Sequence, residues 1–350
     1  MKKKTSKTKA KKGFSTRTKI FTLLAILLIA AGIALFAYFR HTFSDYGESG
    51  KWVYITKDAE EQAIRDSIMT LGETAGETTI RVIGIMGDIK NVKSGAYRID
   101  EKDRPLDIAR RLLRGHQTPV KVTFNNIRTV KQLAEKVSKN MSFTSEDFLN
   151  ACDTILPKHG FRKEQFPAAF IPDSYEFYWT ADAPKVVNRL LKYRNDFWTE
   201  ERRNQAAQEG LTAVDVATIA SIVEEESAKK SERPTIARLY MNRLQKNMLL
   251  QADPTVKFAV GNFALKRITY QHLKKVSPYN TYLNPGLPPG PIRIPEKSTL
   301  EAVLTCQKHD YLYMCAKEDF SGYHNFAKDL ATHQSNAARY QRELNRRGIK

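Results

Sequence analysis

Cysteine is scarce in this chain of 350 residues, which holds only Cys152, Cys306 and Cys315. Their spacing matches no metal-binding pattern and is too sparse for a disulfide-dense scaffold, so the fold is expected to rest on ordinary hydrophobic cores. The sequence leaves open whether Cys306 and Cys315 form a bridge. It also lacks an HExxH metal signature, a GxSxG elbow and a glycine-rich phosphate loop. We therefore predict neither a metal site nor a bound cofactor.

Long apolar runs are also scarce, with a single exception near the N-terminus. Residues 20–39 are uncharged and mostly apolar, and at about 1.5 Å rise per residue they match a hydrocarbon core of roughly 30 Å. Residues 1–19 hold nine Lys or Arg and no acidic residue, whereas Asp45 and Glu48 follow the run closely. This asymmetry predicts a single-pass protein of the cell (inner) membrane, with a cytoplasmic N-terminus and an exported remainder. The alternative is a cleaved signal peptide, but the run is long for one and no clear cleavage site follows it.

Acidic residues are outnumbered, because 57 Lys and Arg face 38 Asp and Glu and give a formal net charge of +19. Beyond the basic tail, the excess is spread along the chain and forms no block. A spread positive charge on an exported chain suits an anionic polymer or a lipid surface, and the bacterial wall polymer fits best. Basic and aromatic side chains are not interleaved as on nucleic-acid-binding surfaces, so no nucleic-acid partner is expected.

Composition predicts an α+β chain with a tether and two folded regions. Residues 40–51 are polar and contain glycine and serine, which is typical of a tether. Residues 52–125 show strands that flank helices and suggest a small binding module of roughly 70 residues. Its expected elements are strands at 52–56, 94–99 and 119–124 and helices after Lys57, at 78–88 and at 108–115. Residues 126–350 are mostly helical, with two strands near the C-terminus, and are expected to form a mixed α/β domain.

Three local signals organise this second region. Thr212, with Asp215 three residues later, predicts a capping box at the start of a helix. The dipeptide at 253–254 predicts another helix start, with Asp253 as the N-cap residue and Gly261 at the helix end. Residues 277–295 contain six prolines, which excludes regular secondary structure there.

Three consecutive glutamates, Glu224, Glu225 and Glu226, lie on the first of these helices. A helical wheel points Glu225 away from the apolar arc and leaves Glu224 at its edge. Glu226 points between Ile219 and Ile222 and so faces apolar surface. Desolvation there raises the pKa of a carboxyl group toward the value that a general acid needs near neutral pH. The alternative for Glu226 is an ordinary ion pair with a Lys or Arg at the helix end.

Polar side chains beside the proline-rich loop predict a cleft that grips hydroxyl-rich ligands. These side chains belong to Asn242, Gln251, Asp253, Asn280 and Tyr282. Each has a structural alternative, since Asp253 can merely cap a helix and Asn280 can merely serve a turn. His324 lies in a predicted strand, where a histidine is more often packed than catalytic.

With these residues in view, the C-terminal region closely resembles the YceG-like (MltG-type) family of membrane-anchored endolytic murein transglycosylases. The segments that carry the resemblance are ASIVEEES at 220–227, NRL at 242–244, DPTV at 253–256, YNTY at 279–282, GLPPGPI at 286–292 and GYHNF at 322–326. Upstream, SGAYR and RLLRG resemble the family's LysM-like module. The resemblance thus implies a LysM-like module at 52–125 and a YceG-like catalytic domain at 126–350. One departure is the pair Asn125–Asn126, where many relatives have Glu-Gly.

The resemblance implies cleavage of peptidoglycan between N-acetylmuramic acid and N-acetylglucosamine, without water and with a 1,6-anhydro end as the product. The family's catalytic glutamate maps onto Glu226, the residue that the helical wheel also selects. The expected substrate-binding residues are Glu224, Gln251, Asp253, Asn280, Tyr282 and His324. Expected partners are nascent glycan strands near the membrane and peptidoglycan synthases. One alternative is a non-catalytic wall-binding scaffold of the elongation or division machinery; another is a hydrolase with Asp253 as its second carboxylate.

Overall fold

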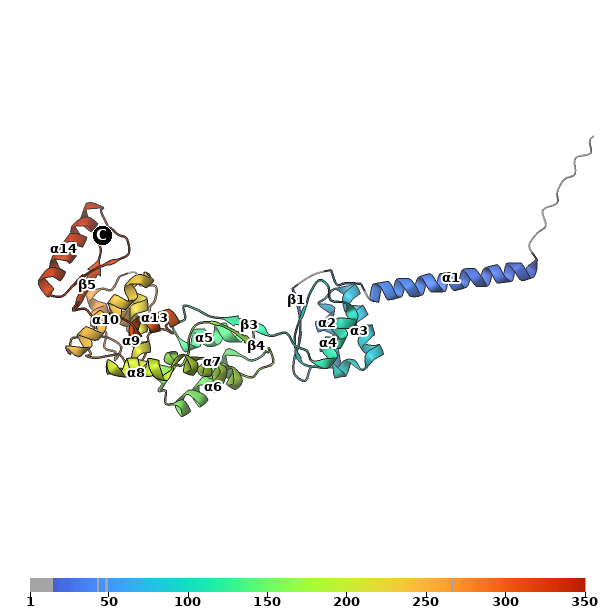
Figure 1. Cartoon of the computed structure of the whole chain (residues 1–350), viewed down its shortest axis with the longest axis horizontal. Coiled ribbons are helices and arrows are strands. Elements are labelled where there is room, and N and C mark those ends of the chain that lie inside the picture. Colours follow the sequence, from blue (N-terminus) through green and yellow to red (C-terminus); the bar gives the residue numbers. More distant parts are fainter. Residues whose placement is uncertain (1–14, 43, 48–49, 266, 350) are drawn as a thin grey trace, which may run out of the picture. The chain divides into compact units, whose positions relative to one another are not determined.

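The computed structural model describes residues 15–42, 44–47, 50–265 and 267–349. Residues 1–14 of the predicted basic tail lie outside this part. The chain divides into two compact units between Thr118 and Pro119 (Figure 1). Helices combine with two-stranded antiparallel ribbons in both units, which confirms the predicted α+β class. Cys306 and Cys315 are both free, so the bridge that the sequence left open does not form.

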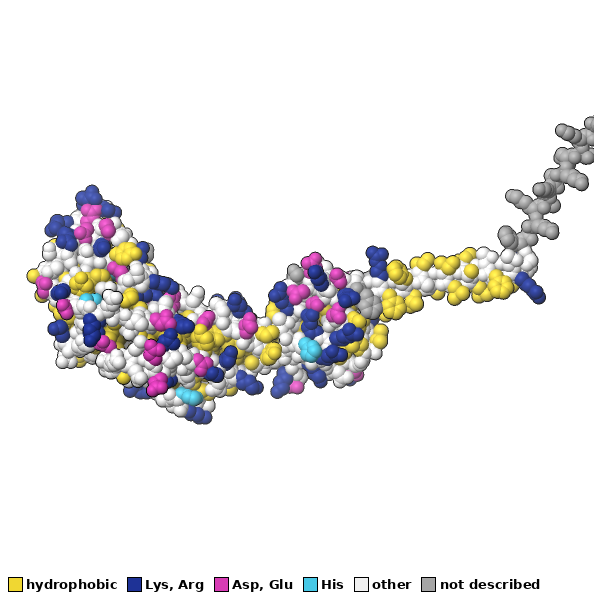
Figure 2. Space-filling view, viewed as in Figure 1, with side chains coloured by type: hydrophobic (Ala, Val, Ile, Leu, Met, Phe, Trp, Pro, Cys, Tyr) yellow, Lys and Arg dark blue, Asp and Glu magenta, His cyan; other side chains and the backbone are white. Residues whose placement is uncertain are grey.

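The first unit begins with a long apolar helix. Its elements are α1 (Thr16–Thr42), β1 (Lys51–Ile55), α2 (Glu61–Met69), α3 (Glu73–Met86), the 3₁₀ helix η1 (Ile89–Asn91), β2 (Gly95–Ile99) and α4 (Pro105–Arg114). Among the described residues, α1 is the one helix long and apolar enough to cross a membrane. Hydrophobic side chains are exposed along it from Ile20 to Phe39 (Figure 2). Residues 20–39 lie within α1, which is therefore a candidate membrane anchor.

The tether is shorter than the predicted 40–51. The backbone N–H of Tyr46 donates to the carbonyl oxygen of Asp103 at 2.7 Å, and its hydroxyl donates to the carbonyl oxygen of Leu71 at 2.8 Å. Tyr46 thus belongs to the folded unit, while α1 continues to Thr42. At about 3.5 Å per residue, the link between Thr42 and Tyr46 spans at most roughly 14 Å. Local composition could not reveal this, because the partners of Tyr46 lie far along the chain.

A compact core joins β1 and β2 to helices α2 and α4. β1 pairs antiparallel with β2, and its alternate residues Val53 and Ile55 are buried, as the period of a half-buried strand requires. The strands predicted at 52–56 and 94–99 are confirmed. The helices contribute the buried residues Ile64, Ile68, Ile108 and Leu112. Gly115 ends α4 in the left-handed conformation with φ 71°, as expected for a glycine after a helix.

The strand predicted at 119–124 exists but belongs to the second unit. As β3 (Val120–Thr123) it pairs antiparallel with β4 (Ser174–Phe177) and buries Val120 and Val122. The predicted boundary at 125/126 is therefore wrong for this strand. The alternation of apolar and polar residues predicts a strand here, but it does not predict which distant segment pairs with that strand.

Helix α9 lies at the centre of the second unit. The elements before it are β3, α5 (Val130–Ser138), α6 (Ser145–Ile155), η2 (Leu156–His159), η3 (Lys163–Ala169), β4, α7 (Ala183–Phe197) and α8 (Glu200–Gln208). Those from it onward are α9 (Ala213–Glu226), η4 (Lys230–Glu232), α10 (Arg233–Gln245), α11 (Asp253–Val260), α12 (Tyr270–Leu273), α13 (Lys297–Leu304), β5 (Tyr313–Ala316), β6 (His324–Ala327) and α14 (Leu330–Arg346). The predicted capping box of Thr212 and Asp215 starts α9. Helices α8, α10, α11 and α13 pack around it, so its side chains from Val216 to Glu224 are buried.

Two features shape the surroundings of the end of α9. Residues 277–295 are irregular, as their prolines predicted, and a Cβ at Gly290 would lie 2.1 Å from the carbonyl oxygen of Glu164, so only glycine fits there. The ribbon of β5 and β6 packs on α14 and forms the C-terminal part of the unit (Figure 1). Asn242 on α10 fixes the segment just before β5 by donating hydrogen bonds to the carbonyl oxygens of His309 and Tyr311.

Candidate active site

A cavity of about 460 Å³ opens at the C-terminal end of α9. Its walls come from α9, α10, the chain before α11, the proline-rich loop, the β5–β6 ribbon and the start of α14. Of the predicted site residues, it contains Glu226, Gln251, Asp253, Tyr282 and His324. Segments far apart in the sequence thus bring most of the predicted residues together. Within the described residues, no three His, Cys, Asp or Glu side chains are grouped so that they could hold a metal ion.

Glu226 is the last residue of α9 and faces this cavity. Burial removes water from its carboxyl group and raises the pKa from 4.5 to about 7. The negative charges of Asp253 and Glu225 act in the same direction, whereas the hydroxyl of Tyr240, 2.7 Å from Oε1, favours the carboxylate. The carboxyl group can therefore both donate and accept a proton near neutral pH.

Arg243 was not among the predicted site residues, yet it organises one wall of the cavity. Its guanidinium donates to Oε1 of Gln251 at 2.6 Å and to the carbonyl oxygens of Leu249 and Leu312 at 2.9 and 3.0 Å. Gln251 has φ 52°, an unusual conformation for a residue with a side chain, and this clamp helps to hold it. The spacing of Tyr240 and Arg243, three residues apart on one helix face, is the sequence signal that could have found both.

Asp253 and Tyr282 form a pair across the cavity. The hydroxyl of Tyr282 donates to Oδ1 of Asp253 at 2.7 Å. Burial is the larger cause that raises the pKa of Tyr282, and this hydrogen bond is the next. Asp253 is the first residue of α11 and Ala252 is its N-cap residue, so the predicted capping role of Asp253 is wrong. Its carboxylate instead meets a residue of the proline-rich loop. Gly261 ends α11 in the left-handed conformation, as predicted.

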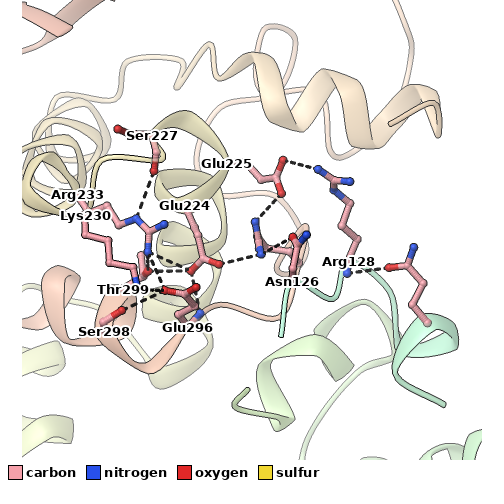
Figure 3. Close-up of polar contacts among 12 residues, drawn as sticks. Asn126, Arg128, Glu224, Glu225, Ser227, Lys230, Arg233, Glu296, Ser298 and Thr299 are labelled. Carbon is pink, nitrogen blue, oxygen red and sulfur yellow. Dashed lines mark hydrogen bonds and ion pairs between the residues drawn. The ribbon is translucent and has the colours of Figure 1, made fainter. Parts of the chain in front are cut away.

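Glu224 and Asn280 lie outside the cavity, contrary to their prediction as substrate-binding residues. The carboxylate of Glu224 is buried between Arg233 and Arg293 and accepts a hydrogen bond from Thr299 (Figure 3). The sequence could not place it, because Arg293 and Thr299 come from a distant segment. Asn280 is fully buried and donates to the backbone carbonyl oxygens of Leu273, at the end of α12, and of Lys275.

Glu225 joins the same buried network from the other side of α9. Its carboxylate lies 2.8 Å from Arg293 and 3.0 Å from Arg128 (Figure 3). Arg293 also donates to Oδ1 of Asn126, which has φ 50°. Asparagine tolerates this left-handed conformation better than other non-glycine side chains. The network fixes the end of α9, and with it the position of Glu226.

Glu226 also borders two further hollows. One, of about 1010 Å³, is lined by α11 and α14, and another, of about 240 Å³, is lined by the turn between β5 and β6. Glu226 therefore borders all three hollows. The cavity thus places one desolvated carboxyl group among tyrosine, histidine and other polar side chains.

Comparisons with known proteins place the chain more narrowly. The YceG-like family matches residues 53–339, and the chain belongs to this family, as the sequence resemblance predicted. It is similar to the endolytic murein transglycosylase of Bacillus subtilis (strain 168), with 38% identity over 155 residues, which cover 44% of this chain and 42% of that protein. The endolytic murein transglycosylase of Streptococcus pneumoniae serotype 2 (strain D39 / NCTC 7466) is 25% identical over 356 residues, which cover 91% and 64%.

The chain thus spans less than two thirds of the length of these two relatives. Among solved structures, it is similar to the 2.6 Å crystal structure of a yceG-like protein from Listeria monocytogenes. The TM-score is 0.53 at 25% identity, over 82% of this chain and 99% of the other.

Proposed function

We propose that this chain is an endolytic murein transglycosylase that cleaves the bond between N-acetylmuramic acid and N-acetylglucosamine. One observation carries the proposal. Glu226 is a desolvated carboxyl group, with a pKa raised to about 7, and it borders both the 460 Å³ cavity and the 1010 Å³ hollow. The relatives named endolytic murein transglycosylases support this substrate class.

The proposed reaction needs only one carboxyl group. Protonated Glu226 gives its proton to the glycosidic oxygen as that bond breaks. The C6 hydroxyl oxygen of the N-acetylmuramic acid residue attacks the anomeric carbon, and the Glu226 carboxylate takes the hydroxyl proton. The products are a free hydroxyl on N-acetylglucosamine and a 1,6-anhydro ring, and Glu226 returns to its protonated form. A hydrolase would need a second carboxylate to activate water or to act as a nucleophile.

The remaining cavity residues bind the sugar in this proposal. Gln251, Asp253, Tyr282 and His324 offer hydrogen-bonding groups to hydroxyl and N-acetyl groups. Glu224 and Asn280 do not contact the sugar in this proposal. Their side chains are buried among protein partners and hold the segments that carry the site.

The first unit brings the reaction close to the membrane. We infer that α1 spans the membrane with its N-terminus in the cytoplasm, so that the short link to Tyr46 keeps the first unit beside the bilayer. The order β1, α2, α3, β2 supports a LysM-like wall-binding module. Nascent strands near the membrane are then the natural substrate, and the synthases that make them are the expected partners.

Product analysis tests this function directly. The full-length chain in detergent, as wild type and as Glu226→Gln, is incubated with purified glycan strands, and the product ends are read by mass spectrometry. We expect 1,6-anhydro ends from the wild type and none from Glu226→Gln, while the exposed variant Asp196→Asn serves as a matched control. Reducing ends would favour the hydrolase with Asp253 as its second carboxylate. Glycan binding without cleavage would favour the scaffold alternative.

A further inference from the structure

His324 on β6 lines the 460 Å³ cavity and also the hollow beside the β5–β6 turn, and Glu226 borders both. Two hydrogen bonds tie His324 to Glu232, one from its backbone N–H to Oε1 at 2.8 Å and one between Nδ1 and Oε2 at 3.0 Å. A carboxylate only accepts hydrogen bonds, so Nδ1 must carry the hydrogen. In the neutral imidazole, Nε2 is then an acceptor.

Glu232 is well placed to fix this arrangement. It lies in η4, just after α9, and only 7% of its surface is exposed. The hydroxyl of Ser227 also donates to its Oε2, at 3.3 Å. On the opposite edge of the imidazole, Nε2 has no hydrogen bond to any residue that the structure describes, and 16% of the side chain is exposed at the cavity. A ring held by two hydrogen bonds to Glu232 thus presents one acceptor atom at the cavity that Glu226 also borders.

We propose that Nε2 of His324 accepts a hydrogen bond from a sugar hydroxyl of the glycan, and that Glu232 is the positioning residue that fixes the required tautomer. This inference rests on the proposed function, because it assumes a glycan as the ligand. It adds a residue without a previous role, Glu232, and assigns the contacting atom of His324. A glycan strand suits such a site, since its hydroxyl groups are abundant neutral donors.

The structural alternative is that the hydrogen bonds between His324 and Glu232 only attach the β5–β6 ribbon to η4. His324→Asn separates the two roles, because the amide nitrogen of asparagine can replace Nδ1 and still donate to Glu232, whereas no atom replaces Nε2. For the full-length chain in detergent, we expect an unchanged melting temperature and a loss of about tenfold or more in kcat/KM on purified glycan. An unchanged kcat/KM with an intact fold would overturn the proposal.

Glu232→Gln tests the tautomer. Its amide group can donate to Nδ1, which moves the imidazole hydrogen to Nε2 and turns the acceptor into a donor. Long-range ¹⁵N–¹H NMR of labelled histidine should show this exchange in Glu232→Gln, together with a similar loss in kcat/KM. Exchange of the tautomer without a loss of activity would count against the proposal.

Glycan affinity is measured in parallel in the Glu226→Gln background, where no cleavage is expected. A wild-type chain that binds glycan but does not cleave it overturns the proposed function alone. Equal glycan affinity with and without His324→Asn overturns the contact proposed here, whatever the reaction.

Discussion

The hydroxyl of Tyr240 on α10 donates a 2.7 Å hydrogen bond to Oε1 of Glu226 at the end of α9. This bond holds one carboxyl oxygen against the protein. Oε2 has no hydrogen bond to a described residue. A single bond from a buried tyrosine therefore sets both the orientation of the candidate acid and part of its acidity.

The first prediction concerns the dependence of activity on pH. Glu226 must be protonated to act as the acid, so kcat/KM should fall as pH rises through about 7. Tyr240→Phe removes a bond that favours the carboxylate, so the pKa of Glu226 should rise and the basic limb should move to higher pH. Tyr178→Phe, at an exposed tyrosine, is the control. A basic limb that stays in place in Tyr240→Phe would contradict this role.

The second prediction concerns stability at high pH. The pKa of Glu226 rises from 4.5 to about 7 on folding, so protonation contributes stability that is fully present below pH 4.5 and is lost as pH rises through 7. Glu226→Gln keeps an acceptor for Tyr240 but carries no charge. Above pH 7 it should be more stable than the wild type by on the order of 2–3 kcal/mol, and the gain should vanish near pH 4.5.

Urea unfolding at pH 4.5 and pH 8 measures this difference. In a Trp52→Phe background, Trp179 and Trp198 report on the second unit alone. A gain in stability that is equal at both pH values would show that the ionisation of Glu226 is not its cause.

The third prediction concerns the buried network behind α9. Glu224→Gln removes the charge that lies 2.9 Å from Arg293 and leaves Glu225, at 2.8 Å, as the remaining carboxylate partner of that arginine. Loss of a buried hydrogen-bonded charge typically costs about 1.5–3 kcal/mol, so the second unit should lose about that much stability. Asp196→Asn breaks the exposed pair with Lys192 and should change little. Thermal unfolding of both variants checks this, and similar effects would refute the assignment of Glu224 as a structural residue.

The fourth prediction concerns Asn280, which the structure assigns to the loop and not to the ligand. Asn280→Ala removes a buried side chain whose amide donates to the carbonyl oxygens of Leu273 and Lys275, and should cost about 1–3 kcal/mol. Leu283→Ser, at an exposed position in the same loop, is the control. Denaturant unfolding measures both. If Asn280→Ala lowers only glycan affinity and leaves stability intact, the residue contacts the ligand after all.

The fifth prediction concerns the reach of the proposed active site from the candidate membrane anchor. Insertion of about 20 Gly and Ser residues between Ser44 and Asp45 adds roughly 25 Å of mean reach. Activity on free glycan should stay unchanged, while the strands left attached to the lipid anchor should become longer. Chromatography of lipid-linked products from both proteins provides the measurement. Remnants of equal length would mean that the tether does not set the cleavage position.

The sequence by itself determined the apolar helix, the α+β class, the capping box of Thr212 and the irregular loop at 277–295. These features depend on neighbours close in the chain, so periodicity and the restricted conformations of proline reveal them. The helical wheel also selected Glu226, because the direction of a side chain on a helix follows from its position alone. The YceG-like segments then pointed to the family.

Tertiary structure alone decided the partners. β3 pairs with β4, which follows two α-helices and two 3₁₀ helices later in the chain. Tyr46 is bound by residues of the first unit, and Arg293 of the proline-rich loop pairs with Glu224. The helical wheel left the role of Glu224 undecided, because Arg293, the nearer of the two arginines that flank its carboxylate, lies almost 70 residues away along the chain. Likewise, the sequence predicted Asn280 as a ligand-binding residue, but its side-chain amide donates to two backbone carbonyl oxygens of the protein. A polar side chain stabilises the fold when folding brings it a hydrogen-bonding partner within the protein, and it can bind a ligand when folding leaves it without one. The local sequence does not show which of these occurs, because the partners come from distant segments.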